Sequence, residues 1–245
     1  MALGRPRPWQ TWTLGGGPGA AQPRHCPGAR LGLLGGTLDP THFGHLDAAE
    51  TARQALGLDE VWLVPSHDPP HRPADPVATS FHRFAMATLA IVELPQYRAS
   101  DLELRRAGPS YTIDTLQELH AAGWAPAQIF FIIGVDAFAD IASWRAFPAV
   151  LDGSNFVVVG RAGTAPAHVA SRAPEIAARV ETPAYRADHP HDTKIFPVDG
   201  RTRDVSSSLI RTRLRNRQRI DDLVPASIER HIMAHGLYRG GRQLA

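Results

Sequence analysis

Four apolar runs of six residues recur along the chain, and each ends in glycine or proline. They are LGLLGG at 31–36, EVWLVP at 60–65, IFFIIG at 129–134 and NFVVVG at 155–160. Such continuous apolar runs, without alternating polar residues, are typical of strands that are buried on both faces. Because helical patterns separate the runs, the order predicts an α/β fold in which helices cover both faces of a parallel sheet.

The stretches between these runs carry apolar residues at helical spacing. In residues 43–58, Leu46, Ala49, Ala52 and Leu56 fall on one helical face. Other helices are predicted at 80–94, 111–123, 207–217 and 225–236, and other strands at 97–104 and 194–198.

Composition divides the chain into an N-terminal extension and one domain. Residues 1–30 contain five prolines, four arginines and no acidic residue, so we expect a disordered extension there and a single domain at 31–245. No apolar run approaches the roughly 20 residues that span a membrane. A single cysteine, Cys26, cannot form an internal disulfide, which favours a cytoplasmic protein. The sequence leaves the oligomeric state open, and a homo-oligomer is compatible with it.

The segment GGTLDPTHFGH at 35–45 follows the first predicted strand and opens the first predicted helix. Unpaired backbone N–H groups and the helix dipole make such a strand–turn–helix unit attractive to phosphate. His42 and His45 lie three residues apart, on one face of the first helical turn, where both imidazoles can donate to an anion. Two simpler readings stay open: an ordinary helix cap by Asp39 or Thr41, and a two-histidine metal site.

A second anion site is indicated at 204–214, DVSSSLIRTRL. Its serines suit a helix start, and the hydroxyl groups of Ser207 and Ser208 can donate hydrogen bonds to phosphate oxygens. Arg211 follows one helical turn later and can reach the same anion. The alternative is a capped amphipathic helix with solvated arginines.

The turn at 35–45 resembles the G-G-T-F-D-P-x-H-x-G-H signature of the HxGH nucleotidyltransferases, with Leu38 in the usual aromatic position, and 204–214 resembles their I-S-S/A-T-x-I-R motif. The resemblance implies a Rossmann-like nucleotidyltransferase fold, ATP as a substrate and Mg²⁺ bound with it. It also implies that His42, His45 and Arg211 are catalytic. The residues that it assigns to ATP are Gly35, Gly36, Thr37, Asp39, Gly134, Asp136, Ser207 and Ser208.

Four further stretches resemble the nicotinate-nucleotide branch of these enzymes. They are VPSHDPPHRP at 64–73, RRAGPSYTIDTL at 105–116, FIIGVDAFADIASWRAF at 131–147 and the segment VVVGRAG at 157–163. Arg145 stands where many relatives have tyrosine. The resemblance assigns the binding of nicotinate mononucleotide to His71, Arg72, Thr112, Trp144 and Arg161. The alternatives are a solvated proline-rich loop at 64–73, a simple helix cap at Thr112 and a core or surface aromatic at Trp144.

The reaction that the resemblance implies is transfer of AMP from ATP to nicotinate mononucleotide, giving deamido-NAD and pyrophosphate. Alternatives are a sister enzyme acting on nicotinamide mononucleotide or phosphopantetheine, and an inactive nucleotide-binding regulator. Seven arginines in 201–219 raise nucleic-acid binding as another class. No aromatic residues are interleaved with them for base stacking, so we expect no nucleic-acid partner.

Overall fold

The computed structural model describes residues 28–70, 77–160, 174–200 and 202–239. Six parallel strands form one sheet in the order β3-β2-β1-β4-β5-β6. The strands are β1 (Leu31–Gly36), β2 (Glu60–Pro65), β3 (Tyr97–Ala99), β4 (Ile129–Gly134), β5 (Asn155–Val159) and β6 (Ile195–Val198).

The chain fills the sheet outward from its centre in two directions. From β1 it builds β2 and β3 on one side, and then it returns to β4 beside β1 and builds β5 and β6 on the other. β1 pairs with β4 from Leu31 opposite Ile129 to Leu34 opposite Ile132. The sheet order therefore reverses between β1 and β4, and ligands bind at the carboxyl ends of strands at such a switch point.

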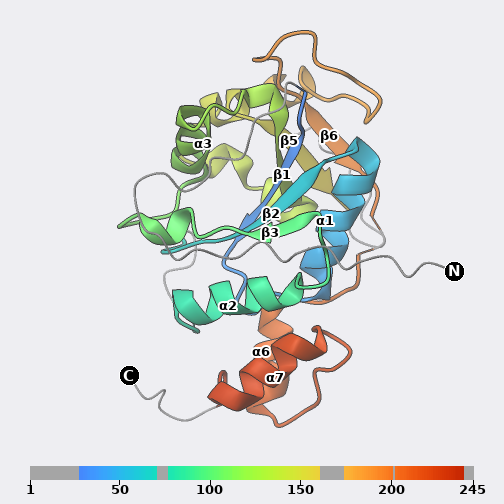
Figure 1. The fold of residues 1–245 in the computed structure, drawn as a ribbon. Helices are drawn as coiled ribbons and strands as arrows, with labels where there is room; N and C mark the ends of the chain where they lie inside the picture. Colours follow the sequence, from blue (N-terminus) through green and yellow to red (C-terminus); the bar gives the residue numbers. More distant parts are fainter. Residues whose placement is uncertain (1–27, 71–76, 161–173, 201, 240–245) are drawn as a thin grey trace, which may run out of the picture.

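Helices cover both faces of the sheet, as the alternating pattern predicts (Figure 1). On one face lie α1 (Phe43–Leu56) and α2 (Ser80–Ala90), and their residues Ala52, Leu56 and Ala87 are buried against the strands. On the other face lie α3 (Thr112–Ala121) and α4 (Val135–Phe138), with Leu116 and Phe138 fully buried. Each face thus has its own hydrophobic core.

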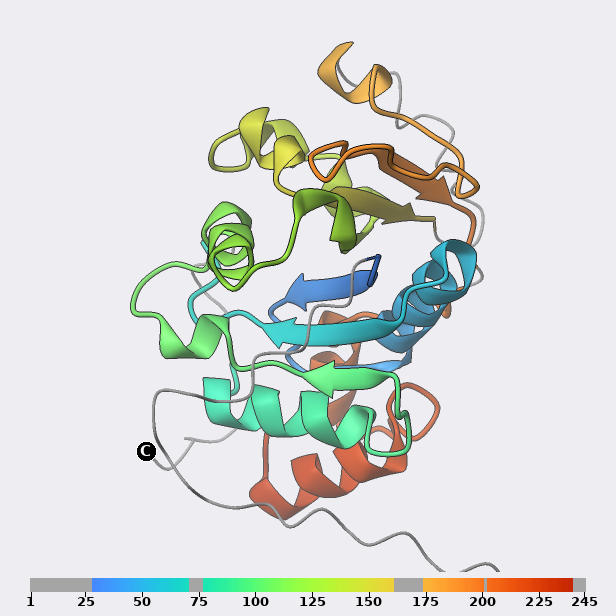
Figure 2. The ribbon, with the colours of Figure 1, turned by 45° about the horizontal axis from the view of Figure 1, so that its top comes forward.

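A third apolar cluster joins the C-terminal helices to the domain. In this cluster, α6 (Ser207–Arg215) and α7 (Ala226–His235) pack around Met86 of α2, and Ile210, Ile228 and Ile232 are fully buried. Figure 1 shows both helices below α2, and in Figure 2 the red helix α7 lies on the side of α2 away from the sheet, in contact with α2. The remaining elements are short: α5 (Pro174–Ala177), η1 (Glu103–Arg105), η2 (Pro126–Gln128), η3 (Ile141–Ser143) and η4 (Ala149–Asp152).

Two predicted elements are longer than the structure makes them. The strand predicted at 97–104 ends at Ala99, and a 3-10 turn follows, which places Glu103 in a buried position. The helix predicted at 80–94 ends at Ala90, because Ile91 leaves the helical conformation with φ −121° and ψ 8° and its N–H bonds to the oxygen of Thr88. Among the described residues, no helix is both long and apolar enough to cross a membrane.

Candidate active site

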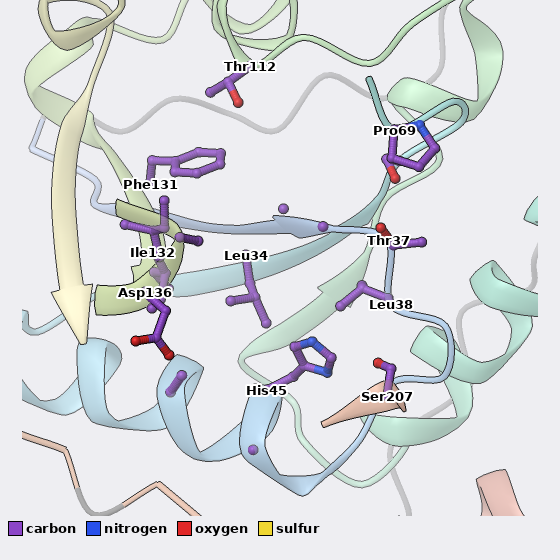
Figure 3. A pocket seen from close by; sticks show the side chains of 18 of the residues that line it. Leu34, Thr37, Leu38, His45, Pro69, Thr112, Phe131, Ile132, Asp136 and Ser207 are labelled. Carbon is purple, nitrogen blue, oxygen red and sulfur yellow. The ribbon is translucent and has the colours of Figure 1, made fainter. Parts of the chain in front are cut away.

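A cavity of about 620 Å³ opens at the carboxyl ends of β1 and β4, at the switch point of the sheet (Figure 3). Its lining comes from the β1–α1 turn, the start of α6, the β4–α4 junction and the start of α3. The structure thus brings together segments that are far apart in the sequence. The predicted site residues that line the cavity are Gly35, Gly36, Thr37, His42, His45, Thr112, Gly134, Asp136, Trp144, Ser207 and Ser208.

The β1–α1 turn has an unusual backbone. Gly36 has a φ of 153° and Leu38 a φ of 51°, so the chain adopts left-handed geometry at a residue with a side chain. The buried Leu38 side chain, 2% exposed, packs in the core against the α1 face. This turn delivers His42 to the N-cap of α1, where helix N–H groups attract anions.

His42 and His45 form a stacked pair at the start of α1. Their ring centroids lie 3.7 Å apart with an interplanar angle of 24°. The His42 backbone N–H donates to Nδ1 of His45 over 3.3 Å. Nδ1 of His45 is therefore an acceptor, so a neutral His45 carries its proton on Nε2. The sequence prediction that both imidazoles share one face of the first turn is confirmed.

Gly44, between the two histidines, packs closely against its surroundings. A Cβ atom at this position would lie 3.2 Å from the His42 ring and 3.3 Å from the backbone oxygen of Arg203. A side chain here would therefore be tightly packed, and the His42 ring or the backbone would have to shift by a few tenths of an ångström.

Asp39 lies behind the cavity and is not among its lining residues. Its carboxylate is 1% exposed and accepts hydrogen bonds from the N–H of Val77 (2.7 Å), the N–H of Ala78 (3.2 Å) and the hydroxyl of Tyr238 (2.6 Å). The structure thus places Asp39 as a support of the turn, which differs from the predicted contact with ATP. Burial and the neighbouring carboxylate raise the pKa of Tyr238, so its hydroxyl remains a donor.

Arg211 also lies behind the lining residues. Its guanidinium donates to the backbone oxygen of Asp39 over 2.8 Å and to the hydroxyl of Ser208 over 3.3 Å. Ser207 donates from its hydroxyl to the backbone oxygen of Pro40 over 3.0 Å. The start of α6 is therefore bonded directly to the β1–α1 turn, and the two predicted anion sites form one surface, with His45 and Ser207 side by side in Figure 3.

Sequence reasoning missed Arg83, a fully buried arginine of α2. It donates to the carbonyl oxygens of Thr37 (2.8 Å), Ser66 (2.5 Å), His67 (3.2 Å) and Ala78 (3.2 Å). Arg83 thereby joins the loops that follow β1 and β2. The sequence pattern could have identified Arg83, because it occupies the same helical face as Met86 and Ala87, an apolar face where a charged residue is unexpected.

The opposite end of the cavity contains two of the residues predicted to bind the acceptor, Thr112 and Trp144. Thr112 is the first residue of α3, and Figure 3 shows it across the cavity from His45. Trp144 lies edge-on to Phe131, with ring centroids 5.8 Å apart. Arg145 pairs with Asp114 at 3.4 Å and lies over the ring of Tyr111 at 4.6 Å.

Glu103 is a second residue that sequence reasoning missed. It lines the cavity but is only 7% exposed, and it accepts a hydrogen bond from the hydroxyl of Thr115 over 2.6 Å. Burial raises its pKa, an effect that Thr115 opposes. No local pattern indicated this contact, because Glu103 fell inside a predicted strand.

Gly134 and Asp136 lie at the junction of β4 and α4, on the cavity wall beside the β1 turn. His71, Arg72 and Arg161, which were assigned to the acceptor, lie outside the described residues.

A parallel sheet with imidazole and hydroxyl donors gathered from two helix starts at its switch point is the arrangement of an α/β protein that binds phosphate groups. Residues 33–213 match the family model described as cytidylyltransferase-like. The chain is 39% identical over 221 residues to a Geotalea daltonii protein named "Probable nicotinate-nucleotide adenylyltransferase", covering 87% of this chain and 100% of that one. A Yersinia enterocolitica protein of the same name is 38% identical, covering 85% and 94%.

The fold has solved counterparts as well. A Plasmodium falciparum nicotinic acid mononucleotide adenylyltransferase, solved in complex with NaAD, superposes with a TM-score of 0.67 at 18% identity, covering 86% of this chain and 97% of that one. This likeness confirms the predicted Rossmann-like fold. The chain belongs to the nicotinate-nucleotide adenylyltransferases of the cytidylyltransferase-like family.

Proposed function

We propose that this protein transfers AMP from ATP to nicotinate mononucleotide, forming deamido-NAD and pyrophosphate. The observation that carries the proposal is the cavity itself. Its phosphate-binding groups, His42, His45, Ser207 and Ser208, lie at one end, and the aromatic residue Trp144 and the helix start at Thr112 lie at the other. A volume of about 620 Å³ is within the usual range for small-molecule sites.

The reaction is a nucleophilic substitution at the α-phosphorus of ATP. A phosphate oxygen of the acceptor attacks the α-phosphorus of ATP, a new P–O bond forms, and the bond from that phosphorus to the bridging oxygen of the β-phosphate breaks. Pyrophosphate leaves with the electron pair. The acceptor phosphate is already ionised at neutral pH, so it needs no general base. Catalysis then consists of positioning the two phosphates and stabilising developing negative charge.

The α1 start supplies that stabilisation. With Nδ1 of His45 accepting from the backbone, the Nε2–H of a neutral ring is the donor that we assign to a phosphate oxygen. His42, stacked on His45 at the N-cap, adds a second imidazole at the positive end of the helix. Arg211 positions Ser208 and the turn through its bonds to Ser208 and Asp39, and it adds positive charge close to the same phosphates.

The start of α3 explains a preference for nicotinate over nicotinamide. The first N–H groups of a helix have no intrahelical acceptor and attract anions such as a carboxylate. Thr112 adds a hydroxyl at this position, and the indole of Trp144 lies on the same cavity wall for stacking on the pyridine ring. The carboxamide of nicotinamide is neutral and lacks the negative charge that this helix start would attract. His71, Arg72 and Arg161 remain assigned to the acceptor on their sequence motifs.

Mg²⁺ is proposed to enter with the triphosphate. Within the described residues, no group of three metal-ligating side chains lies in the cavity, and the Asp39 carboxylate is occupied by Val77, Ala78 and Tyr238. The side chains thus do not form a resident magnesium cage. A Mg²⁺ ion bound by phosphate oxygens and water, as Mg²⁺ prefers, would neutralise charge on the leaving pyrophosphate. The single cysteine of the sequence supports a cytoplasmic location, where thiols stay reduced.

Release of pyrophosphate with ATP, Mg²⁺ and one acceptor at a time tests the proposal. Nicotinate mononucleotide should give the fastest turnover, and nicotinamide mononucleotide and phosphopantetheine should be poor acceptors. In Thr112→Val, KM should rise for nicotinate mononucleotide more than for ATP, whereas Thr88→Val, on the outer surface of α2, should be silent. Equal rates with nicotinate and nicotinamide acceptors would refute the assigned specificity, and no release with any acceptor would refute the activity.

A further inference from the structure

Three histidines gather at the contact between α2 and α7, away from the cavity. His82 belongs to the first turn of α2, and His231 and His235 lie one turn apart on α7. None of the three lines the cavity, and the proposed reaction uses none of them. Figure 1 shows the two helices side by side at the C-terminal end of the domain, and residues of both share one apolar cluster.

The imidazoles converge on one point. One ring nitrogen from each histidine lies within 4.8 Å of the other two, and Nδ1 of His82 lies 3.1 Å from Nε2 of His231. Ring centroids are separated by 5.2 Å (His82–His231), 4.9 Å (His82–His235) and 4.5 Å (His231–His235). Ligand nitrogens about 2.0–2.1 Å from a tetrahedral ion are roughly 3.4 Å apart, so only small side-chain rotations separate this cluster from a coordination site.

The chemistry of the donor set is specific. Three imidazoles without a carboxylate suit zinc and similar transition-metal ions rather than Mg²⁺ or Ca²⁺. A hydrogen bond between His82 and His231 explains why these two rings lie close together, but it does not explain the position of His235.

We propose that His82, His231 and His235 bind a divalent transition-metal ion of the zinc class through three imidazole nitrogens. His235 is exposed and the other two are half-buried, so an ion can enter from solvent and keep a water molecule as its fourth ligand.

The position of the site gives the ion a structural role. His82 precedes Arg83, which bonds to Thr37 in the β1–α1 turn. His235 is three residues before Tyr238, which bonds to Asp39 in the same turn. An ion between α2 and α7 therefore joins the two helices whose neighbouring residues support the nucleotide-binding turn from behind.

The test uses the full chain without a histidine tag, stripped of metal by a chelator and dialysed. Zn²⁺ is titrated calorimetrically, Co²⁺ is followed by its visible absorption, and thermal unfolding is recorded with and without Zn²⁺. We expect one ion per chain, Co²⁺ bands typical of tetrahedral coordination and a rise in Tm with Zn²⁺.

The variants His82→Gln and His235→Gln should each weaken Zn²⁺ binding at least tenfold and remove the rise in Tm. His189→Gln, an exposed histidine outside the cluster, is the matched control and should bind like the wild type. Because His235 is exposed, its variant should fold normally, as far-ultraviolet circular dichroism will check. Absence of a bound ion in the wild type, or unchanged binding in both cluster variants, would overturn the proposal. Since no nucleotide is present, neither result bears on the adenylyltransferase activity.

Discussion

At the scale of single residues, one hydrogen bond prepares His45 for its role. The backbone N–H of His42 occupies Nδ1, so the proton of the neutral ring lies on Nε2. Gly44 favours this arrangement, because a Cβ atom there would lie only 3.2 Å from the His42 ring. The H-x-G-H spacing therefore has a steric reason as well as a chemical one.

His45→Ala should reduce kcat by on the order of a hundredfold, or about 3 kcal/mol, because a donor aimed at transition-state charge is lost. The fold should persist, since His45 lies on the wall of an open cavity. Steady-state pyrophosphate release measures kcat, and circular dichroism checks the fold. His189→Ala is the control. Turnover close to that of the wild type in His45→Ala would exclude the catalytic role.

Arg83→Met should lower the free energy of unfolding by about 3 kcal/mol or more, because four buried carbonyl contacts lose their donor. Arg98→Met is the matched control: Arg98 is 57% exposed and pairs with Glu60 on the surface, so its loss should cost about 1 kcal/mol or less. Urea denaturation compares the two variants. Similar losses in both would show that the buried contacts of Arg83 contribute little.

At the scale of elements, Glu50 links α1 to β3. Its carboxylate accepts hydrogen bonds from Arg53 and Gln54 of α1 and from the hydroxyl of Tyr97 in β3, over 2.6–2.7 Å. The Arg53 guanidinium, helped by Tyr97 and Gln54 and opposed by burial, lowers the pKa of Glu50 from 4.5 to about 2. The attachment of this helix to the edge strand therefore includes a hydrogen bond from the Tyr97 hydroxyl to an ionised carboxylate.

The stability from this contact should depend on pH in a defined window. A carboxyl group with a lowered pKa stabilises the fold above its unfolded pKa, and that contribution is lost as pH falls towards the folded pKa. The difference in unfolding free energy between wild type and Glu50→Gln should thus be full near pH 7 and shrink between pH 4.5 and about 2. Urea denaturation across this range checks the trend. A difference that stays constant down to pH 2 would contradict the ionic contribution.

At the scale of the whole molecule, the cavity takes residues from both halves of the sheet. The β1 turn belongs to the half that continues into β2 and β3, and the junction at Gly134 belongs to the half that continues into β5 and β6. A nucleotide bound at the switch point therefore contacts both halves at once.

Binding of ATP with Mg²⁺ should slow hydrogen exchange in both 35–45 and 134–140, and also at the start of α6. At a ligand concentration about 100 times Kd, the free energy of unfolding should rise by about 2.7 kcal/mol, since only the folded state binds. Mass-spectrometric hydrogen exchange and thermal unfolding measure these effects. Protection confined to one half of the sheet would contradict the shared site.

The sequence by itself determined the features that depend on neighbours along the chain. Continuous apolar runs, helical spacing and cap residues act over a few positions, and they predicted the parallel sheet, the helix starts after the β1 turn and at Ser207, and the placement of Thr112 at a helix start. Local signals failed where a residue's partner belongs to another element, as for Glu103, which is hydrogen-bonded to Thr115 of α3.

Only the tertiary structure decided which buried groups meet. Arg83 reaches Thr37 across 46 positions, His82 reaches His231 across 149, and Tyr238 reaches Asp39 across 199. No periodicity encodes such pairs, because each depends on how the helices pack over the sheet and on the cost of leaving a buried polar group without a partner. Packing thus turned Asp39 from an expected ligand contact into an internal support of the turn that presents His42 and His45.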